Sequence, residues 1–163
     1  MNRRQPSLPK RRAARFAAVQ ALYQLEVGGQ PVEEVVGEFR QHRLTSLLEP
    51  FAPEAASPPV DAAWFERVVR GAHRMAPELD PMIEACLAPG WTLQRCGYLL
   101  RACLRAGAFE LAACPDVPVA AVINEYVEVA HMFFDGDEPA FVNAVLDRLA
   151  RRLRAASSSN PAS

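Results

Sequence analysis

The chain has 163 residues, half of them hydrophobic, and a formal net charge of -1. This length supports one hydrophobic core, or two small cores that share an interface. No apolar run approaches the ~20 residues of a membrane span, and the basic N-terminus leads into an amphipathic segment instead of a signal peptide's apolar core. We therefore expect a cytoplasmic protein without a membrane segment.

The first half of the chain is divided by proline and glycine. Residues 1–10 are polar and basic, and we predict a disordered arm. Apolar residues at helical spacing predict a helix over 11–27, ended by Gly28-Gly29, and a second helix over 31–44. Residues 45–60 contain four prolines among alanine and serine, and indicate a long connection.

The middle of the chain predicts three further helices. The first covers 61–75 and begins with an aspartate N-cap. We expect Pro77 and Pro81 to end it and to bracket the start of a short separate helix that stops at Pro89. The longest helix is predicted over 92–113.

Two more helices complete the chain. One is predicted over 119–130, and an acidic turn at 135–138 precedes the last. Residues 155–163 are mostly serine, asparagine and proline, and we predict a disordered tail. No segment alternates with period two long enough to indicate a strand, so we predict an all-α fold of about seven helices, with residues 11–154 as a single domain.

The cysteines and histidines argue against a metal site or another cofactor. Cys86, Cys96, Cys103 and Cys114 are ten, seven and eleven residues apart, so no CxxC pair exists, and the three histidines are scattered. Most of these thiols fall where a helix needs small apolar side chains. We expect reduced cysteines in or near the core.

The first predicted helix opens with basic residues. Only one of the 18 basic residues is a lysine, and six basic and no acidic residues precede residue 16: Arg3, Arg4, Lys10, Arg11, Arg12 and Arg15. Cations at a helix N-terminus are unfavourable by roughly 0.3–1 kcal/mol each, whereas an anion is favoured by the free N–H groups and by the dipole. A phosphate backbone is the expected partner, and a solvated basic tail is the alternative.

A second basic stripe is predicted on the long helix. Tyr98, Arg101, Arg105 and Phe109 recur at three- and four-residue steps, and such a mixture can grip phosphates and stack on bases. The open alternative is that the aromatic residues are half-buried and the arginines pair with acidic neighbours. Four further arginines suit the dipole at the end of the last helix and are expected to form a solvated face: Arg148, Arg151, Arg152 and Arg154.

No enzyme signature is present, since the sequence has no GxGxxG, P-loop, GxSxG or HExxH motif, and we predict a protein that is not an enzyme. Glu125 and Glu128 lie one turn apart and are expected to form a solvated acidic face. After the acidic turn, Phe141 by itself indicates a core position and Asn143 a surface position.

Several stretches of about residues 11–150 resemble the NusB family of transcription antitermination factors. The arginine-rich opening is followed by Ala-Val-Gln-Ala-Leu-Tyr at 18–23. The long helix contributes Trp91, Arg95, Leu104-Arg105 and Phe109-Glu110-Leu111. The strongest similarity comes last, and it consists of Asp116-Val117-Pro118, Val122-Ile123-Asn124-Glu125, Val129-Ala130 and the run from Phe141 to Asp147.

This resemblance implies two packed helical subdomains, binding of a short single-stranded RNA element called boxA, and a heterodimer with the ribosomal protein NusE. It also implies that the complex joins elongating RNA polymerase with other Nus factors and suppresses termination, notably in ribosomal RNA operons. In the family the arginine-rich N-terminus contacts RNA. The expected RNA surface combines these family positions with the stripe on the long helix: Arg11, Arg12, Arg15, Gln20, Arg101, Arg105, Phe141 and Asn143.

Two other classes of protein fit these features less well. An rRNA cytosine methyltransferase can carry a NusB-like domain at its N-terminus, followed by a long Rossmann-like catalytic region. This sequence ends about ten residues after its last predicted helix, so this alternative requires the sequence to be a fragment. A helical DNA-binding regulator would need a recognition helix after a tight turn, and none stands out.

Overall fold

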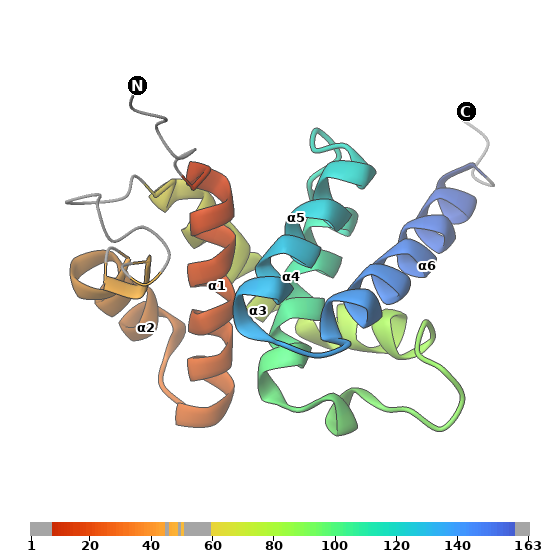
Figure 1. Ribbon diagram of the computed structural model, residues 1–163, viewed down its shortest axis with the longest axis horizontal. Coiled ribbons are helices and arrows are strands. Elements are labelled where there is room, and N and C mark those ends of the chain that lie inside the picture. The colour runs from red at the N-terminus through yellow and green to blue at the C-terminus, as the bar shows by residue number, and fades with distance from the viewer. Residues whose placement is uncertain (1–7, 45, 49, 51–59, 159–163) are drawn as a thin grey trace.

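The computed structural model describes residues 8–44, 46–48, 50 and 60–158. The expected basic arm, the proline-rich connection and the C-terminal tail lie largely outside these residues. The described part is helical and contains no strand, which confirms the all-α fold class (Figure 1). Its bounds give six α-helices, one fewer than the predicted seven: α1 (Lys10–Gly28), α2 (Val32–Glu38), α3 (Ala62–Glu84), α4 (Tyr98–Ala113), α5 (Val119–Phe133) and α6 (Glu138–Ser158).

Three short turns of other helix types accompany them. A π-helical turn, η1 (Phe39–Arg43), continues α2 and so accounts for most of the predicted helix over 31–44. The 3₁₀ turns η2 (Ser46–Leu48) and η3 (Leu93–Cys96) lie in the connections before α3 and α4. α1 ends at Gly29 with φ 67°, as the double glycine predicted, because glycine adopts this left-handed conformation without steric cost.

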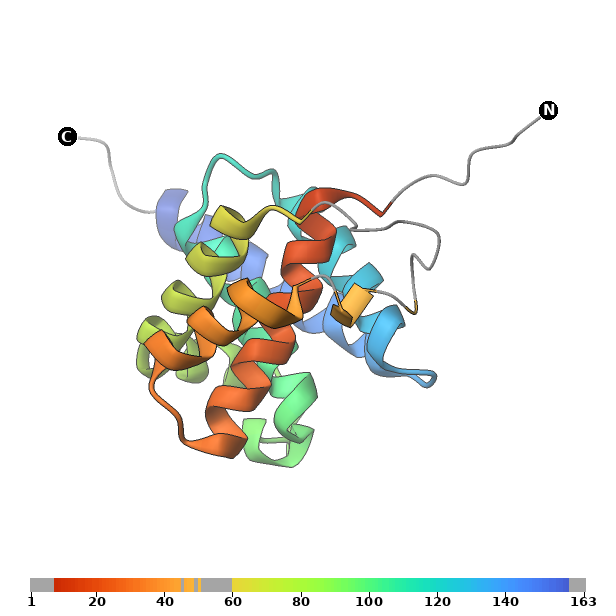
Figure 2. The same ribbon diagram turned by 90° about the vertical axis from the view of Figure 1, so that its left-hand side faces the viewer.

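α4 is the central helix, and it packs against α1, α3, α5 and α6. α1 and α2 cover one side of the molecule, while α5 and α6 cover the other (Figures 1 and 2). Residues all round α4 are buried, which is the expected pattern for a helix enclosed by other helices: Arg101, Ala102, Cys103, Leu104, Ala106, Gly107, Ala108, Phe109 and Glu110. One continuous apolar core extends from α1 to α6.

The predicted break at Pro77 and Pro81 is wrong, because α3 continues through both prolines. Each proline removes a backbone donor and disfavours a helix interior by roughly 3 kcal/mol. Leu79 and Ile83 are fully buried on the same helix, and burial of each such side chain is worth about 1.5–3 kcal/mol. Their packing offsets the local cost, so two predicted helices are one.

The predicted helix over 92–113 is interrupted at Gly97. Thr92 caps η3 by accepting a hydrogen bond from the Arg95 N–H at 3.3 Å. Gly97 then takes φ 79° and ψ 162°, which is not helical, and α4 begins at the next residue. The interruption leaves Tyr98 in the first turn of α4, where its side chain is 50% exposed.

The end of the last helix also differs from the prediction. α6 extends to Ser158, so residues 155–158 are helical instead of belonging to a disordered tail.

The N-terminal end of α3 agrees with the prediction, since the Asp61 side chain accepts a hydrogen bond from the Trp64 N–H at 3.0 Å. Helix caps are local features, whereas helix length depends on packing further along the chain.

Close approach of α3 to α4 requires glycine at position 71. A Cβ atom added to Gly71 would lie 2.1 Å from Cε2 of Phe109, which is buried. We expect Gly71→Ala to lower the free energy of unfolding by about 1–3 kcal/mol, because the ring must move within a packed core. Gly37→Ala is the matched control in α2, since nothing lies within 4 Å of its added Cβ. Urea denaturation that finds the two variants equally stable would contradict this account.

Candidate nucleic-acid interface

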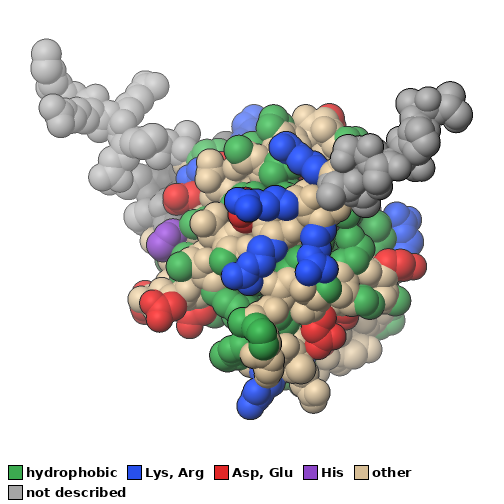
Figure 3. Space-filling view, turned by 90° about the vertical axis from the view of Figure 1, so that its right-hand side faces the viewer, with side chains coloured by type: hydrophobic (Ala, Val, Ile, Leu, Met, Phe, Trp, Pro, Cys, Tyr) green, Lys and Arg blue, Asp and Glu red, His purple; other side chains and the backbone are tan. Residues whose placement is uncertain are grey.

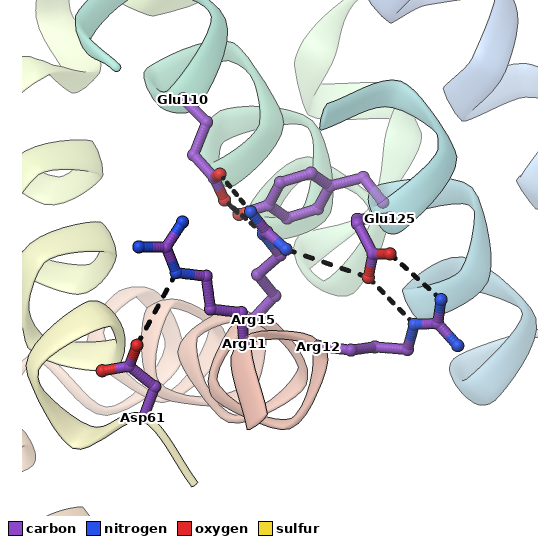
Figure 4. Close-up of polar contacts among 7 residues, drawn as sticks. Arg11, Arg12, Arg15, Asp61, Glu110 and Glu125 are labelled. Atoms are coloured by element: carbon purple, nitrogen blue, oxygen red, sulfur yellow. Dashed lines mark hydrogen bonds and ion pairs between the residues drawn. The ribbon is translucent and has the colours of Figure 1, made fainter. Parts of the chain in front are cut away.

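Arg15 of α1 is buried, with 4% of its surface exposed. Its Nε and Nη2 atoms donate to the two carboxylate oxygens of Glu110 on α4, each at 2.8 Å. The hydroxyl of Tyr126 on α5 donates to the same carboxylate (Figure 4). This buried triad therefore ties three helices together.

The environment of Arg15 keeps its guanidinium charged. Burial alone would lower the pKa of Arg15, but the hydrogen bonds and the charge of Glu110 raise it above its ordinary value. Burial together with the neighbouring Glu110 raises the pKa of Tyr126 well above its ordinary value. This geometry does not fit the phosphate contact expected of Arg15, because the side chain is buried, Nε and Nη2 donate to Glu110, and Nη1 lies 3.8 Å from Glu125. The sequence analysis gave Glu110 no role, although this residue belongs to the family-like run Phe109-Glu110-Leu111 and is a carboxylate within an apolar helix.

Arg12 lies nearer the surface and pairs with Glu125 of α5. Its Nε and Nη2 atoms donate to Glu125 at 2.9 and 3.0 Å, and about one quarter of each side chain is exposed. The hydrogen bond from Arg12 holds the pKa of Glu125 below its ordinary value. The expected acidic face is therefore only half correct, since Glu125 is paired while Glu128 is exposed.

Arg11 and Lys10 occupy the first turn of α1 and are exposed. The Arg11 Nε atom lies 3.6 Å from Asp61, and its guanidinium lies 4.2 Å from the centre of the Trp64 ring. The guanidinium of Arg67, on α3, lies 5.0 Å from the same ring. Pro9 provides no side-chain cap for α1. An uncapped helix N-terminus beside three exposed cations is a suitable site for an anion.

The arginine stripe predicted on the long helix faces acidic side chains instead of solvent. Arg101 is 8% exposed and its Nη2 atom lies 2.5 Å from Glu26 of α1. Arg105 donates to both oxygens of Asp80 at 2.8 and 2.7 Å, and Phe109 is buried. The structure thus has the acid-paired arrangement that the sequence left open, and it does not bring these arginines to an exposed basic surface.

A groove of about 490 Å³ opens between α1, the start of α4 and the residue after α5. Its lining includes Gln20, Tyr23, Tyr98 and Phe134. Tyr23 is 38% exposed, and its ring meets that of Tyr98 edge to face, with centroids 6.4 Å apart. Sequence reasoning identified Gln20 but did not assign Tyr23 a role, although its place in the Ala-Val-Gln-Ala-Leu-Tyr segment was a usable signal.

Arg12 in the first turn of α1 and Tyr23 in the groove lie on the same side of that helix. Arg12 and Tyr23 are eleven residues apart, which is three helical turns or about 16 Å along the axis. Between them, Phe16 stacks on Phe133 at 4.5 Å, so α5 borders the same side. Residues 13–19, between Arg12 and Tyr23, are buried, so the cations of the first turn and the aromatic groove are two separate surface features joined by α1, here together termed the α1 track.

Phe141 and Asn143 lie in the first turns of α6. Phe141 is half-buried, and its ring centroid lies 6.2 Å from that of Trp91, which is 49% exposed. Asn143 is exposed. Contact of either residue with RNA stays a prediction.

The described residues contain no group of three histidine, cysteine or acidic side chains placed to hold a metal ion. The four cysteines are free thiols, of which Cys86, Cys103 and Cys114 are buried. Burial raises the pKa of the Cys103 thiol to about 12. Across the described ranges, no helix combines the length and the apolar character needed to cross a membrane.

An all-α protein that presents cations and aromatic rings along one helix has the features of a helical nucleic-acid-binding protein. The NusB family profile matches residues 12–151, and the chain belongs to the NusB family.

Proteins with curated names support this assignment. The chain is 50% identical over 145 residues to the transcription antitermination protein NusB of Rhizobium rhizogenes, covering 89% of this chain and 88% of that protein. It is 47% identical over 154 residues to the protein of the same name from Agrobacterium fabrum, covering 93% of this chain and 91% of that one.

Solved structures have the same fold. The solution structure of NusB from Aquifex aeolicus matches with a TM-score of 0.70 and 25% identity, covering 96% of this chain and 97% of that one. A crystal structure of the antitermination factors NusB and NusE in complex with dsRNA matches with a TM-score of 0.65 and 23% identity, covering 86% of this chain and 96% of that one. The second likeness is evidence for the fold alone.

Proposed function

We propose that this protein is a transcription antitermination factor that binds RNA together with the ribosomal protein NusE. Family membership supports the class of function, and the relatives named above are antitermination proteins. The single observation that supports RNA binding is the α1 track, in which exposed cations at the start of α1 and an aromatic groove beside Tyr23 are held by one helix. The protein acts on elongating RNA polymerase with other Nus factors, notably in ribosomal RNA operons, and so works in the cytoplasm.

The residues of the α1 track have different roles in RNA binding. Lys10, Arg11 and Arg12 bind phosphates, and the exposed rings of Tyr23 and Tyr98 stack on bases. Gln20 lies in the same groove, where its amide can both donate to and accept from a base edge. A boxA-type single strand suits this groove, because only unpaired bases can turn toward such rings.

The buried arginines support the track without contacting RNA. Arg15 anchors α1 to α4 through Glu110. The guanidinium of Arg101 lies 5.0 Å from the ring of Tyr98, while its charge is paired with Glu26 of α1. Both arginines therefore fix the positions of the RNA-binding side chains.

The protein acts by binding and is not an enzyme. The methyltransferase alternative would require a catalytic region beyond the helical module, whereas the curated relatives carry an antitermination name and are covered over about nine-tenths of their length. Methyl transfer by the purified protein would reverse this assignment.

Replacing Tyr98 by alanine is expected to weaken binding of single-stranded RNA by about 1–3 kcal/mol, since one stacked base loses its platform. Tyr98→Phe is the matched control, because it keeps the ring and removes only the hydroxyl. Fluorescence anisotropy with a labelled boxA-type strand measures both affinities. Equal losses in the two variants would show that the ring does not stack on a base.

NusE is expected to strengthen RNA binding, because a basic ribosomal protein beside α1 extends the positive surface. The coupling should be about 1–3 kcal/mol, which corresponds to a change in affinity of about 5- to 150-fold, and should be the same measured from either ligand. The experiment titrates a boxA-type single strand and its duplex into the protein, with and without NusE. Identical dissociation constants with and without NusE would contradict the mechanism, and preference for the duplex would contradict the role of the groove.

A further inference from the structure

The exposed side of the C-terminal half of α6 carries four arginines, here termed the α6 arginine face: Arg148, Arg151, Arg152 and Arg154. Figure 3 shows basic side chains gathered on the side of the molecule that carries α6. These arginines lie on a different helix from the RNA track of α1, with α4 and α5 between the two (Figure 1). The proposed RNA site therefore does not account for them.

The charge of this face is poorly compensated. Elsewhere in the described chain, most arginines form ion pairs, including Arg12, Arg15, Arg40 and Arg105. On α6, Arg152 and Arg154 have no ion pair or hydrogen bond with any described residue, and Arg151 has only an exposed pair with Asp147 at 3.1 Å. Arg148 donates to the carbonyl of Cys86 at the end of α3, at 3.0 Å.

This arrangement works against the helix locally. Arg148 and Arg152 are four residues apart, while Arg151 and Arg154 are three apart, so like charges are neighbours on the helix surface. The dipole at the end of α6 compensates part of this repulsion. An anionic partner would compensate the remaining repulsion between the arginines.

Arg154 of the α6 arginine face lines one edge of an apolar groove of about 410 Å³. α4 contributes Leu111 and Ala112, the following loop and α5 contribute Val117 and Val119, and α6 contributes Leu153. Arg154 also lines the groove, and its guanidinium is the only charged group among the lining side chains. The groove therefore combines aliphatic walls with a cationic edge.

We propose that the groove and the α6 arginine face together form a docking site for an acidic protein segment that carries an aliphatic side chain. The aliphatic side chain enters the groove, and the neighbouring carboxylates pair with Arg151 and Arg154. Planar guanidinium forks bind carboxylates with two hydrogen bonds, which favours arginine at such a site. The site gives the protein a contact that is independent of RNA.

Three other occupants fit the described lining less well. RNA bases would find no aromatic ring among the groove residues on which to stack. Residues 155–163, which follow the face in the sequence, contain neither an acidic residue nor a large apolar one. A second copy of the chain would need its own acidic and aliphatic segment at this edge, and the test below detects it.

The test uses a fluorescein-labelled peptide of alternating glutamate and leucine with the full-length protein. Arg151→Gln combined with Arg154→Gln removes the charge, and Ala112→Trp fills the groove from an exposed position without removing a core side chain. Arg40→Gln is the control, because Arg40 is an exposed arginine that follows α2 on the opposite side of the molecule. Circular dichroism verifies that each variant is folded.

We expect saturable binding that weakens at least tenfold in both test variants and is unchanged in Arg40→Gln. Peptides with serine for leucine, or lysine for glutamate, should not bind. Binding that survives Ala112→Trp, or equal binding of the serine peptide, would overturn the proposal. So would an RNA strand that requires Arg151 and Arg154 while the peptide fails to bind. A dimer in sedimentation that Ala112→Trp dissociates, without peptide binding, would assign the surface to a second copy.

Discussion

Replacing Arg15 by methionine is expected to lower the free energy of unfolding by about 3–5 kcal/mol, because it leaves a carboxylate buried without its counter-charge. Glu110 is fully buried and accepts two of its three hydrogen bonds from Arg15. Tyr126 can supply only one further donor. Urea denaturation of the purified variant, followed by circular dichroism, measures the change.

The controls separate a buried charge from a simple loss of contacts. The triple variant Arg15→Met, Glu110→Met, Tyr126→Phe replaces the whole triad with apolar side chains, and it should recover most of the lost stability. Arg12→Met breaks the partly exposed pair with Glu125, and it should cost only about 0–1 kcal/mol. If the triple variant is less stable than Arg15→Met, the contacts within the triad stabilise the fold by more than it costs to leave the buried Glu110 carboxylate unpaired.

Neutralising Lys10, Arg11 and Arg12 together is expected to weaken RNA binding by about 100-fold at about 0.1 M salt. Each phosphate contact to a single strand contributes about 0.7 to the slope of log affinity against log salt, so the slope should fall by about 2. Glutamine at all three positions leaves the buried Arg15 in place. RNA titrations at several salt concentrations measure both the affinity and the slope.

A matched control removes the same charge at the other end of the molecule. Glutamine at Arg148, Arg152 and Arg154 of α6 lowers the net charge equally but leaves the α1 track intact. RNA affinity should then change little. A similar loss in both triple variants would indicate that RNA responds to overall charge, and would remove the special role of the first turn of α1.

The sequence by itself determined the all-α class, the caps and the family. Asp61 caps the start of α3 and Gly29 caps the end of α1 through their own side-chain and backbone preferences, which need no distant partner. The basic opening of α1 was equally visible, because charge and helix position are local properties. Gln20 was assigned through the family resemblance, and it does lie in the groove.

Only the tertiary structure decided which arginines are buried and which are exposed. Arg11, Arg12 and Arg15 are the same residue type within one stretch of five positions. In the fold, however, Arg15 is buried against Glu110, which lies 95 positions further along the chain, whereas the Arg11 side chain is half exposed. The same holds for α3, where buried leucine and isoleucine keep a helix intact across two prolines. Ion pairing and burial depend on residues that are distant along the chain. A local sequence pattern therefore predicts where a helix forms, but not which of its side chains are buried, paired or exposed.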